Sequence, residues 1–128
     1  MSGLLLDTHV IVWMLDDSPR LGRRTRSLIS SASSVKYSPA SLWELRIKEL
    51  KGRIELPPEL AQLLRAAGLV ELPITSEDAL GIQTSDTLHG DPFGRMISSQ
   101  ARRNTLTLVT ADQLLLNDAL ATTIDARL

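Results

Sequence analysis

The stretch Leu4-Leu5-Leu6-Asp7 decides the fold. Three consecutive leucines without polar alternation are typical of a strand that is buried on both faces of a parallel sheet. The run ends at Asp7, and apolar residues then recur with helical spacing from Val10 to Leu15. A buried strand with an acidic residue at its end and a helix behind it indicates the first unit of an α/β sheet.

The same alternation of short apolar runs and helical segments continues along the chain. Further strands are predicted at Val35–Tyr37, Leu69–Leu72 and Leu106–Val109. Helices are predicted between the strands, at about residues 20–31, 39–51, 60–67, 75–84 and 92–103. Strands separated by helices imply a mostly parallel sheet that is covered on both faces. We therefore expect an α/β fold with three α/β/α layers in a single domain over residues 1–128.

The composition matches one globular domain and excludes several classes of protein. The chain has 128 residues, of which 43% are hydrophobic. Its net charge of -1 gives no global positive field, so any RNA binding has to be local. The chain has no cysteine for a disulfide or a thiolate metal site, and its longest apolar run, Val10–Leu15, is too short to cross a membrane. We expect a cytoplasmic protein.

Four acidic residues are the candidates for chemistry. Asp7 and Asp112 follow two of the predicted strands, while Glu44 and Asp91 lie near the starts of helices. Binding sites in open α/β sheets form beyond the carboxyl ends of the strands. Converging carboxylates repel one another unless a cation neutralises them, and ligands that are all oxygen suit Mg²⁺ or Mn²⁺. Such a cation lowers the pKa of a bound water and so provides a nucleophile.

Each of these acids also has a purely structural interpretation. Asp7, Asp91 and Asp112 stand where they can cap the helices that follow them. The segment Ser41-Leu42-Trp43-Glu44 fits a capping box, and Glu44 can pair with Lys48 four residues later. The spacing of the acids alone leaves both interpretations open.

Four segments together resemble the successive signatures of PIN-domain proteins of the VapC toxin type. In chain order they are Leu5–Val10, Ser41–Lys48, His89–Arg95 and Leu108–Asp112. The resemblance spans nearly the whole chain and implies the toxin of a type II toxin–antitoxin pair. Such a toxin is a Mg²⁺- or Mn²⁺-dependent endoribonuclease that cleaves structured RNA, for example tRNA or rRNA. The resemblance also implies a homodimer and a VapB-type antitoxin, through which alone the pair contacts operator DNA.

The resemblance also exposes a gap in the acidic site at Gly94. It implies that Asp7, Glu44 and Asp112 surround the metal, and that an aspartate belongs where this chain has Gly94. Asp91, one helical turn earlier, is the remaining candidate ligand. We expect position 94 to need neither a positive φ nor a close backbone approach, so glycine has no local advantage there. We interpret the site as weakened or inactive; the alternative function is an inactive scaffold that dimerises and binds an antitoxin.

Cationic and aromatic residues give less specific predictions. Candidate contacts for RNA phosphates or for an acidic antitoxin segment are Arg46, Lys48, Lys51 and Arg95. Trp13, Trp43 and Phe93 share helix faces with aliphatic residues and are expected in the core. The chain would then have no aromatic platform for successive bases, which favours recognition of RNA shape over single-strand stacking.

Overall fold

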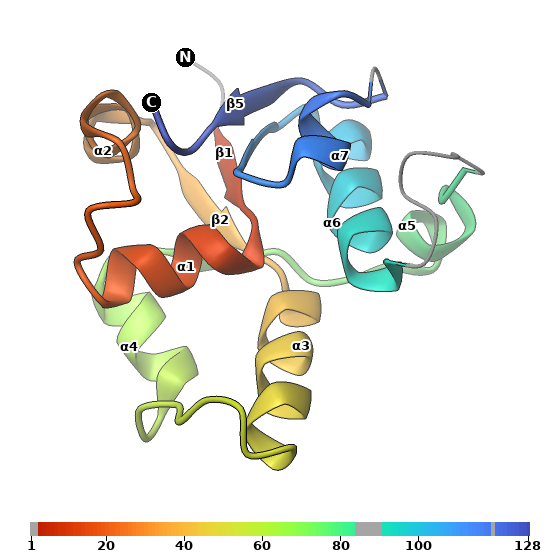
Figure 1. Cartoon of the computed structure of the whole chain (residues 1–128). Coiled ribbons are helices and arrows are strands. Elements are labelled where there is room, and N and C mark those ends of the chain that lie inside the picture. The colour runs from red at the N-terminus through yellow and green to blue at the C-terminus, as the bar shows by residue number, and fades with distance from the viewer. Residues whose placement is uncertain (1–2, 84–90, 119) are drawn as a thin grey trace.

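One five-stranded sheet forms the centre of the molecule (Figure 1). The computed structural model describes residues 3–83, 91–118 and 120–128. The strands lie in the order β3-β2-β1-β4-β5, and all four pairings are parallel. Their bounds are β1 (Leu4–Leu6), β2 (Val35–Tyr37), β3 (Val70–Glu71), β4 (Thr107–Thr110) and β5 (Thr123–Asp125). The predicted parallel sheet is confirmed.

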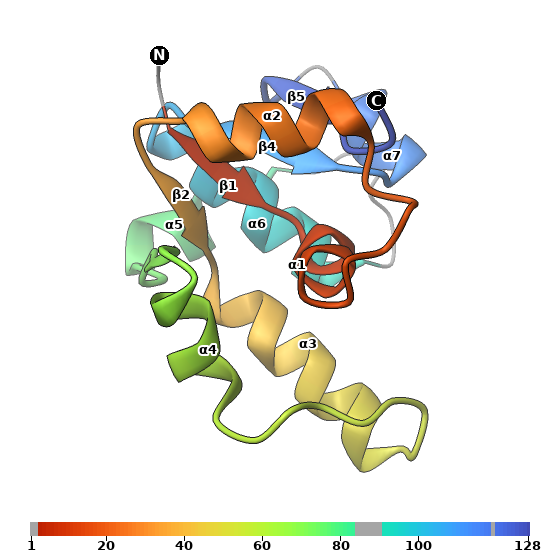
Figure 2. The same cartoon turned by 90° about the vertical axis from the view of Figure 1, so that its left-hand side faces the viewer.

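Helices cover both faces of this sheet, as Figure 1 and Figure 2 show from two sides. The helices are α1 (Thr8–Leu15), α2 (Arg23–Ser31), α3 (Pro39–Leu50), α4 (Leu60–Ala66), α5 (Ser76–Leu80), α6 (Pro92–Arg103) and α7 (Gln113–Leu116). Leu4 and Leu6 pack on one face with residues of α1, α2 and α4, whereas Leu5 packs on the other with residues of α3, α6 and α7. All three leucines are buried, which confirms the central strand and the α/β/α layers.

The ends of α3 follow from local chemistry. Ser38 caps the helix by accepting a hydrogen bond from the backbone N of Ala40, and Pro39 occupies the first turn, where its missing N–H is no loss. Gly52 follows the helix with a φ of 73°, a conformation that glycine adopts without strain. The start and the end predicted for this helix are both confirmed.

The C-terminal segment sets the start of α2. The backbone N of Gly22 donates to the carbonyl of Ala126, and the backbone N of Thr25 donates to the carbonyl of Leu128. A Cβ at Gly22 would overlap the backbone of Leu128, so glycine is required for this close approach. The helix therefore begins at Arg23, whereas the sequence predicted a start near residue 20.

Two C-terminal elements, α7 and β5, were not predicted. Both are short, and β5 is only partly buried, because it is an edge strand that pairs with β4 alone. The helix predicted over residues 75–84 ends at Leu80; its last predicted residue, Thr84, lies outside the described residues. Across the part of the chain that the structure describes, no helix has both the length and the apolar character of a membrane span.

The prediction that Trp43 lies in the core is wrong. Trp43 is 64% exposed, because α3 runs away from the sheet and contacts only α1 and α6 closely (Figure 1). Trp13 is partly buried and packs against the core cluster on the α1 side of the sheet. Phe93, at the start of α6, is half-buried. Only Trp13 therefore has the position expected of a core aromatic residue.

Candidate active site

Asp7 lies directly after the central strand and is 5% exposed. Its backbone N donates to the carbonyl of Val109 at 2.9 Å, which places it beside the end of β4. One carboxylate oxygen, Oδ1, accepts from the backbone N of Thr8 at 2.8 Å and caps α1. The other, Oδ2, accepts from Oγ1 of Thr110 at 2.6 Å. The predicted capping role is confirmed, and the second oxygen ties the carboxylate to the neighbouring strand.

The carboxyl group of Asp7 has an unfavourable environment for its charge. Burial raises the pKa of Asp7, and the hydrogen bonds from Thr110 and Thr8 and the charge of His9 oppose that increase only in part. The negative charge of Glu44 adds to the rise in the pKa. Within the described residues, no lysine or arginine forms an ion pair with Asp7.

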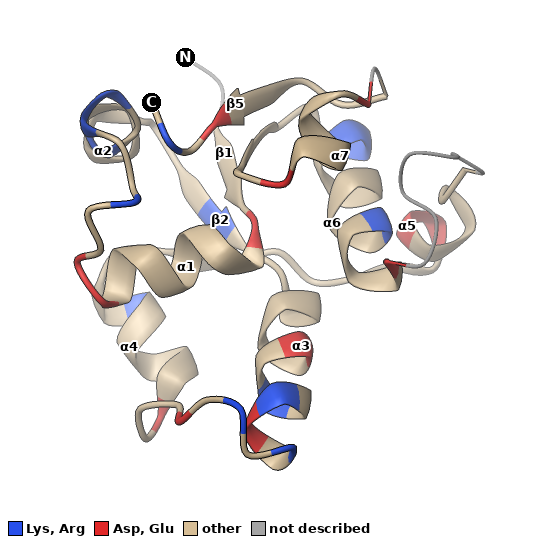
Figure 3. Cartoon of the chain, in the orientation of Figure 1, with Lys and Arg blue, Asp and Glu red and all other residues tan. Residues whose placement is uncertain are grey.

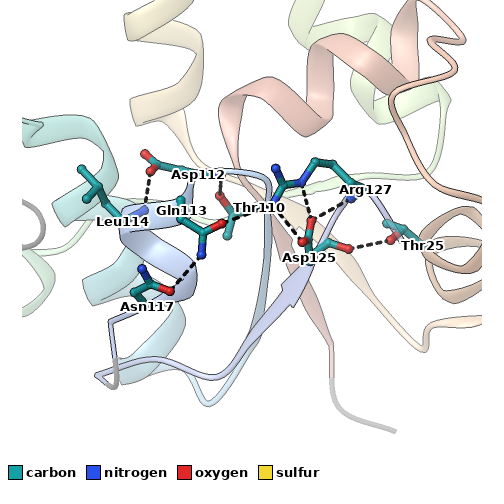
Figure 4. A network of polar contacts seen from close by, with 8 residues as sticks. All are labelled: Thr25, Thr110, Asp112, Gln113, Leu114, Asn117, Asp125 and Arg127. Carbon is teal, nitrogen blue, oxygen red and sulfur yellow. Dashed lines mark hydrogen bonds and ion pairs between the residues drawn. The ribbon is translucent and has the colours of Figure 1, made fainter.

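Two threonines connect Asp7 to two of the other candidate acids. Thr8 follows Asp7 in the chain, and its Oγ1 donates to Oε1 of Glu44 at 2.7 Å. Thr110 donates to Asp7, and its Oγ1 accepts from the backbone N of Asp112 at 3.0 Å (Figure 4). The structure thus brings Asp7, Glu44 and Asp112 into one hydrogen-bonded network. These bridges were not predicted, although a threonine close to each strand-end aspartate was visible in the sequence.

Glu44 and Asp112 each make a contact of their own as well. Oε2 of Glu44 lies 3.6 Å from Nζ of Lys48, so the predicted pair one turn along α3 is confirmed. The predicted capping box is wrong, because α3 begins at Pro39, two residues before Ser41, and Oγ of Ser41 lies 3.0 Å from Oγ1 of Thr8 instead. Asp112 accepts from the backbone N of Leu114 and caps α7.

Asp91 and Gly94 are coupled at the start of α6. Oδ1 of Asp91 accepts from the backbone N of Gly94 at 3.0 Å, which confirms the predicted cap. A Cβ at position 94 would overlap Oδ2 of the same carboxylate. The φ of Gly94 is not positive, as expected. The three atoms nearest to that Cβ all belong to the side chain of Asp91, so the close neighbour that the sequence did not reveal is a carboxylate and not the backbone. No contact described here joins Asp91 to the Asp7 network, and His89 and Gly90 of this motif lie outside the described residues.

The donor atoms of this region suit a hard divalent cation, but the ligand set is incomplete. The candidate ligands are carboxylates, and Asp7 is buried without a neutralising base, which is the chemistry of a Mg²⁺ or Mn²⁺ site. Among residues 3–83, 91–118 and 120–128, however, no three His, Asp or Glu side chains are grouped closely enough to hold a metal ion. The acids are near one another without forming a complete metal centre.

The cationic candidates lie on α3, just beyond it, and on α6. Figure 3 shows acidic positions at the β1–α1 junction, on α3 and before α6, with basic positions further along α3. Arg46 pairs with Glu49 on α3, and Lys51 is exposed just beyond that helix. Arg95 lies beside Asp91 in the lining of a small cavity of about 220 Å³. Lys48 contacts the candidate acid Glu44.

A groove opens next to the acid network, between α1, α3, α4 and the segment that joins α3 to α4. Its volume is about 720 Å³. Most of its lining is apolar, with Val12, Leu45 and Leu60 contributed by the three helices. Thr8 and Lys48 also line it, and both contact Glu44. The groove is therefore continuous with the acidic site.

The sequence model of the PIN domain matches residues 4–118. The chain belongs to the PIN-domain family. Ribonuclease VapC22 of Mycobacterium tuberculosis is 29% identical to this PIN domain in an alignment 122 residues long that covers 90% of this chain and 91% of that protein. The resemblance to VapC-type PIN proteins that the motifs predicted is confirmed.

Solved structures share the fold of this PIN domain. The structure of DNA-bound VapBC from Salmonella typhimurium matches with a TM-score of 0.67 and 17% identity, over 98% of each chain. FitAcB from Neisseria gonorrhoeae matches with a TM-score of 0.62 and 23% identity, over 96% of this chain and 97% of that one. At these identities the likeness establishes the architecture alone.

Proposed function

We propose that this PIN domain is the toxin of a type II toxin–antitoxin pair, an endoribonuclease that uses Mg²⁺ or Mn²⁺ to cleave structured RNA such as tRNA or rRNA. The observation that carries the proposal is Asp7, a buried carboxylate at the end of the central strand with a raised pKa and no described basic partner. Burial of an unpaired charge destabilises a fold, and a bound cation removes that effect. The name of the relative Ribonuclease VapC22 agrees with this activity.

The candidate residues have distinct roles in this proposal. Asp7 and Asp112 would hold the cation; the Thr110 hydroxyl donates to the Asp7 carboxylate and accepts from the backbone N of Asp112. Asp91 is the third ligand, and Glu44 is a further acid that Thr8 and Lys48 orient. When bound, the cation would polarise the phosphodiester of the RNA and lower the pKa of a bound water.

We also propose that Gly94 weakens this activity. The family resemblance places an aspartate at position 94, and the described acids fall short of a metal-binding group. The Asp91 carboxylate occupies the space where a side chain at position 94 would begin, but one of its oxygens is used to cap α6. Asp91 therefore replaces the missing carboxylate only in part.

The substitution Gly94→Asp tests the nuclease proposal. We expect it to raise Mn²⁺-dependent cleavage of purified tRNA or rRNA by more than about 100-fold, since supporting groups alone contribute 10- to 100-fold. Gly94→Ala is the matched control, because its Cβ displaces the Asp91 carboxylate in the same way and adds no ligand. Strong EDTA-sensitive cleavage by the unaltered chain would contradict the weakening by Gly94. Absence of cleavage after Gly94→Asp would contradict the nuclease.

A VapB-type antitoxin is the partner that we propose, and the groove beside Glu44 is its docking site. One neighbour in fold is VapBC bound to DNA. The apolar groove lining suits one face of an amphipathic segment, and the adjoining acids suit an Arg or Lys of that segment. We also propose that the chain forms a homodimer and that it contacts operator DNA only through the antitoxin.

An inactive antitoxin-binding scaffold is the second candidate function. The glycine at position 94 and the incomplete acid group favour it. This function predicts that the unaltered chain dimerises and binds its antitoxin in EDTA, and that Gly94→Asp produces no cleavage. Sedimentation with and without the antitoxin, beside the cleavage assay, distinguishes the two functions.

A further inference from the structure

The most exposed aromatic side chain of the described residues stands next to the acidic network. Trp43 immediately precedes Glu44 on α3 and is 64% exposed. A large aromatic side chain that burial does not account for is the kind of residue that binds a partner. The other tryptophan, Trp13, packs against the core and has no such position.

Phe93 holds the ring of Trp43 in place. The centroids of the two rings are 5.3 Å apart with an interplanar angle of 84°, an edge-to-face contact. The contact joins α3, which carries Glu44, to the first turn of α6, which Asp91 caps. The contact therefore fixes the indole ring against the first turn of α6, two residues after Asp91.

We propose that Trp43 stacks against one unpaired base of the RNA beside the cleaved phosphate. The proposal rests on the proposed ribonuclease function and assigns a specificity-determining residue to it. The acids repel the phosphates of the RNA, and the net charge of -1 supplies no compensating field, so local contacts must provide the affinity. Stacking on an aromatic ring does not depend on charge and binds any exposed base.

The cations along α3 complement this contact. Arg46 lies one turn beyond Trp43 with 60% of its side chain exposed, and Lys51 is exposed at the end of the helix. Arg46 pairs with Glu49, but its exposed guanidinium still lies one turn from the ring, and an aromatic ring near a cation is the usual composition of a surface that binds unpaired nucleotides. One ring accommodates one base, which fits a loop of a folded RNA better than a long single strand.

A second copy of the chain is a less suitable occupant of this surface. A stable protein interface buries about 800 Å² on each partner around a core that is depleted of charge. The other strongly exposed apolar residue of α3 is Leu50, which lies about 10 Å along the helix from Trp43. Arg46 lies between them on the same helix face with 60% of its side chain exposed, beside the partly buried Ile47, so this surface carries a charge at its middle.

Tryptophan fluorescence tests the contact directly. The probes are an RNA hairpin with an adenine-rich loop and a blunt duplex of the same stem, both in EDTA so that no cleavage occurs. The variant Trp13→Phe leaves Trp43 as the only tryptophan, and Trp43→Phe leaves Trp13. We expect the hairpin to quench the first variant saturably, with little effect on the second and little effect of the duplex on either. If Trp13→Phe does not fold, fluorine-labelled tryptophan in the unaltered chain resolves the two rings by NMR.

Hairpin affinity provides the second measurement. We expect Trp43→Ala to weaken binding about 10-fold, within the range for one stacked base. Leu50→Ala is the matched control, because it removes an equally exposed apolar side chain from the same helix and should leave the affinity unchanged.

Several results would overturn the inference. They are equal hairpin affinities for Trp43→Ala and the unaltered chain, no hairpin binding at all, or equal effects of hairpin and duplex. A concentration-dependent shift in Trp43 emission without RNA, together with a dimer in sedimentation that Trp43→Ala dissociates, would assign the ring to a second copy.

The cleavage assay separates this inference from the proposed function. If Gly94→Asp cleaves RNA and the double variant with Trp43→Ala has the same KM, the stacking inference is wrong and the nuclease function is supported. If the hairpin quenches Trp43 but Gly94→Asp does not cleave, the contact stands and the nuclease is wrong.

Discussion

Two aspartates at the ends of strands in the same sheet, Asp7 and Asp125, have opposite environments. The carboxylate of Asp125 accepts three hydrogen bonds from Arg127, one from its backbone N and two from its guanidinium group (Figure 4). The side-chain hydrogen bond from Arg127 lowers the pKa of Asp125, whereas burial raises the pKa of Asp7. The chain neutralises one of these charges and leaves the other.

This difference distinguishes a structural acid from a candidate functional one. Arg127, two residues later, stabilises the charge of Asp125. The backbone carbonyl of Asp125 also accepts a hydrogen bond from Oγ1 of Thr25 on α2. Asp7 is held as firmly, but by hydroxyl and amide groups that fix its position without supplying a positive charge. In the function that we propose, a cation from outside the chain neutralises this rigid, buried carboxylate.

The largest expected effect is on cleavage. In the Gly94→Asp background, Asp7→Asn should reduce cleavage by more than about 100-fold, beyond the effect of a group that only supports a ligand. Asp125→Asn, the matched substitution at the other strand end, should change it less than about 2-fold, because exposed ion pairs contribute little beyond stability. Single-turnover cleavage rates give both values, and equal losses would remove the distinction between the two aspartates.

Loss of the Thr110 hydroxyl should have a smaller effect on the same reaction. Thr110→Val removes the donor to Asp7 and the acceptor for the backbone N of Asp112. We expect a 10- to 100-fold lower rate in the Gly94→Asp background, which is typical of groups that orient a metal ligand. Thr110→Ser keeps the hydroxyl and should restore most of the rate. A Ser variant as slow as Val would show that packing, not the hydroxyl, matters.

Substitution of Asp125 should reduce stability in a pH-dependent way. Its folded pKa is lowered from 3.8, so its contribution is present above that value and is lost as the pH falls through the folded pKa. Asp125→Asn should therefore destabilise the fold at neutral pH by about 0.5–1 kcal/mol, a modest figure because solvent screens the half-exposed Arg127. Urea unfolding should show this difference shrinking below pH 4, and a constant difference would argue against the ion pair.

The smallest expected effect is that of Asp7→Asn on the stability of the fold. Its sign should be opposite to that of Asp125→Asn. The folded pKa of Asp7 is raised, so its contribution is present below the unfolded value of 3.8 and is lost as the pH rises through the folded pKa. In EDTA at neutral pH, Asp7→Asn should raise the melting temperature by a degree or two, with no gain at acidic pH. Mn²⁺ should raise the melting temperature of the unaltered chain but not that of Asp7→Asn. Destabilisation by Asp7→Asn at neutral pH would contradict the unneutralised charge.

The central parts of the fold and the candidate acids could be predicted because local signals specify them. Leu4–Leu6 is apolar throughout, and the acids at strand ends and helix starts are visible in sequence. The hydroxyl bridges were not predictable in this way, because they depend on the register that pairs Leu6 with Val109 and so places Thr110 beside Asp7. The edge strand β5 gives a weak signal because only one strand pairs with it.

Trp43 and Gly94 show two further limits of the sequence. Helical periodicity indicates which residues share a face, but it does not tell how far another element covers that face, and Trp43 is left 64% exposed. Local propensity describes the backbone of Gly94, but it does not reveal that the side chain of Asp91 turns into the adjacent space. Both features concern neighbours in space, which the sequence alone does not show.

The order of the strands also determines when the acidic site forms during synthesis. The central strand β1 pairs with β4, and the hydrogen bond from Thr110 to Asp7 joins residues 103 positions apart. Contacts between such distant positions form late in folding. A nascent chain that has not yet released β4 from the ribosome therefore has Asp7 and Glu44 but lacks Asp112, and an unfinished or truncated product cannot carry the activity that we propose.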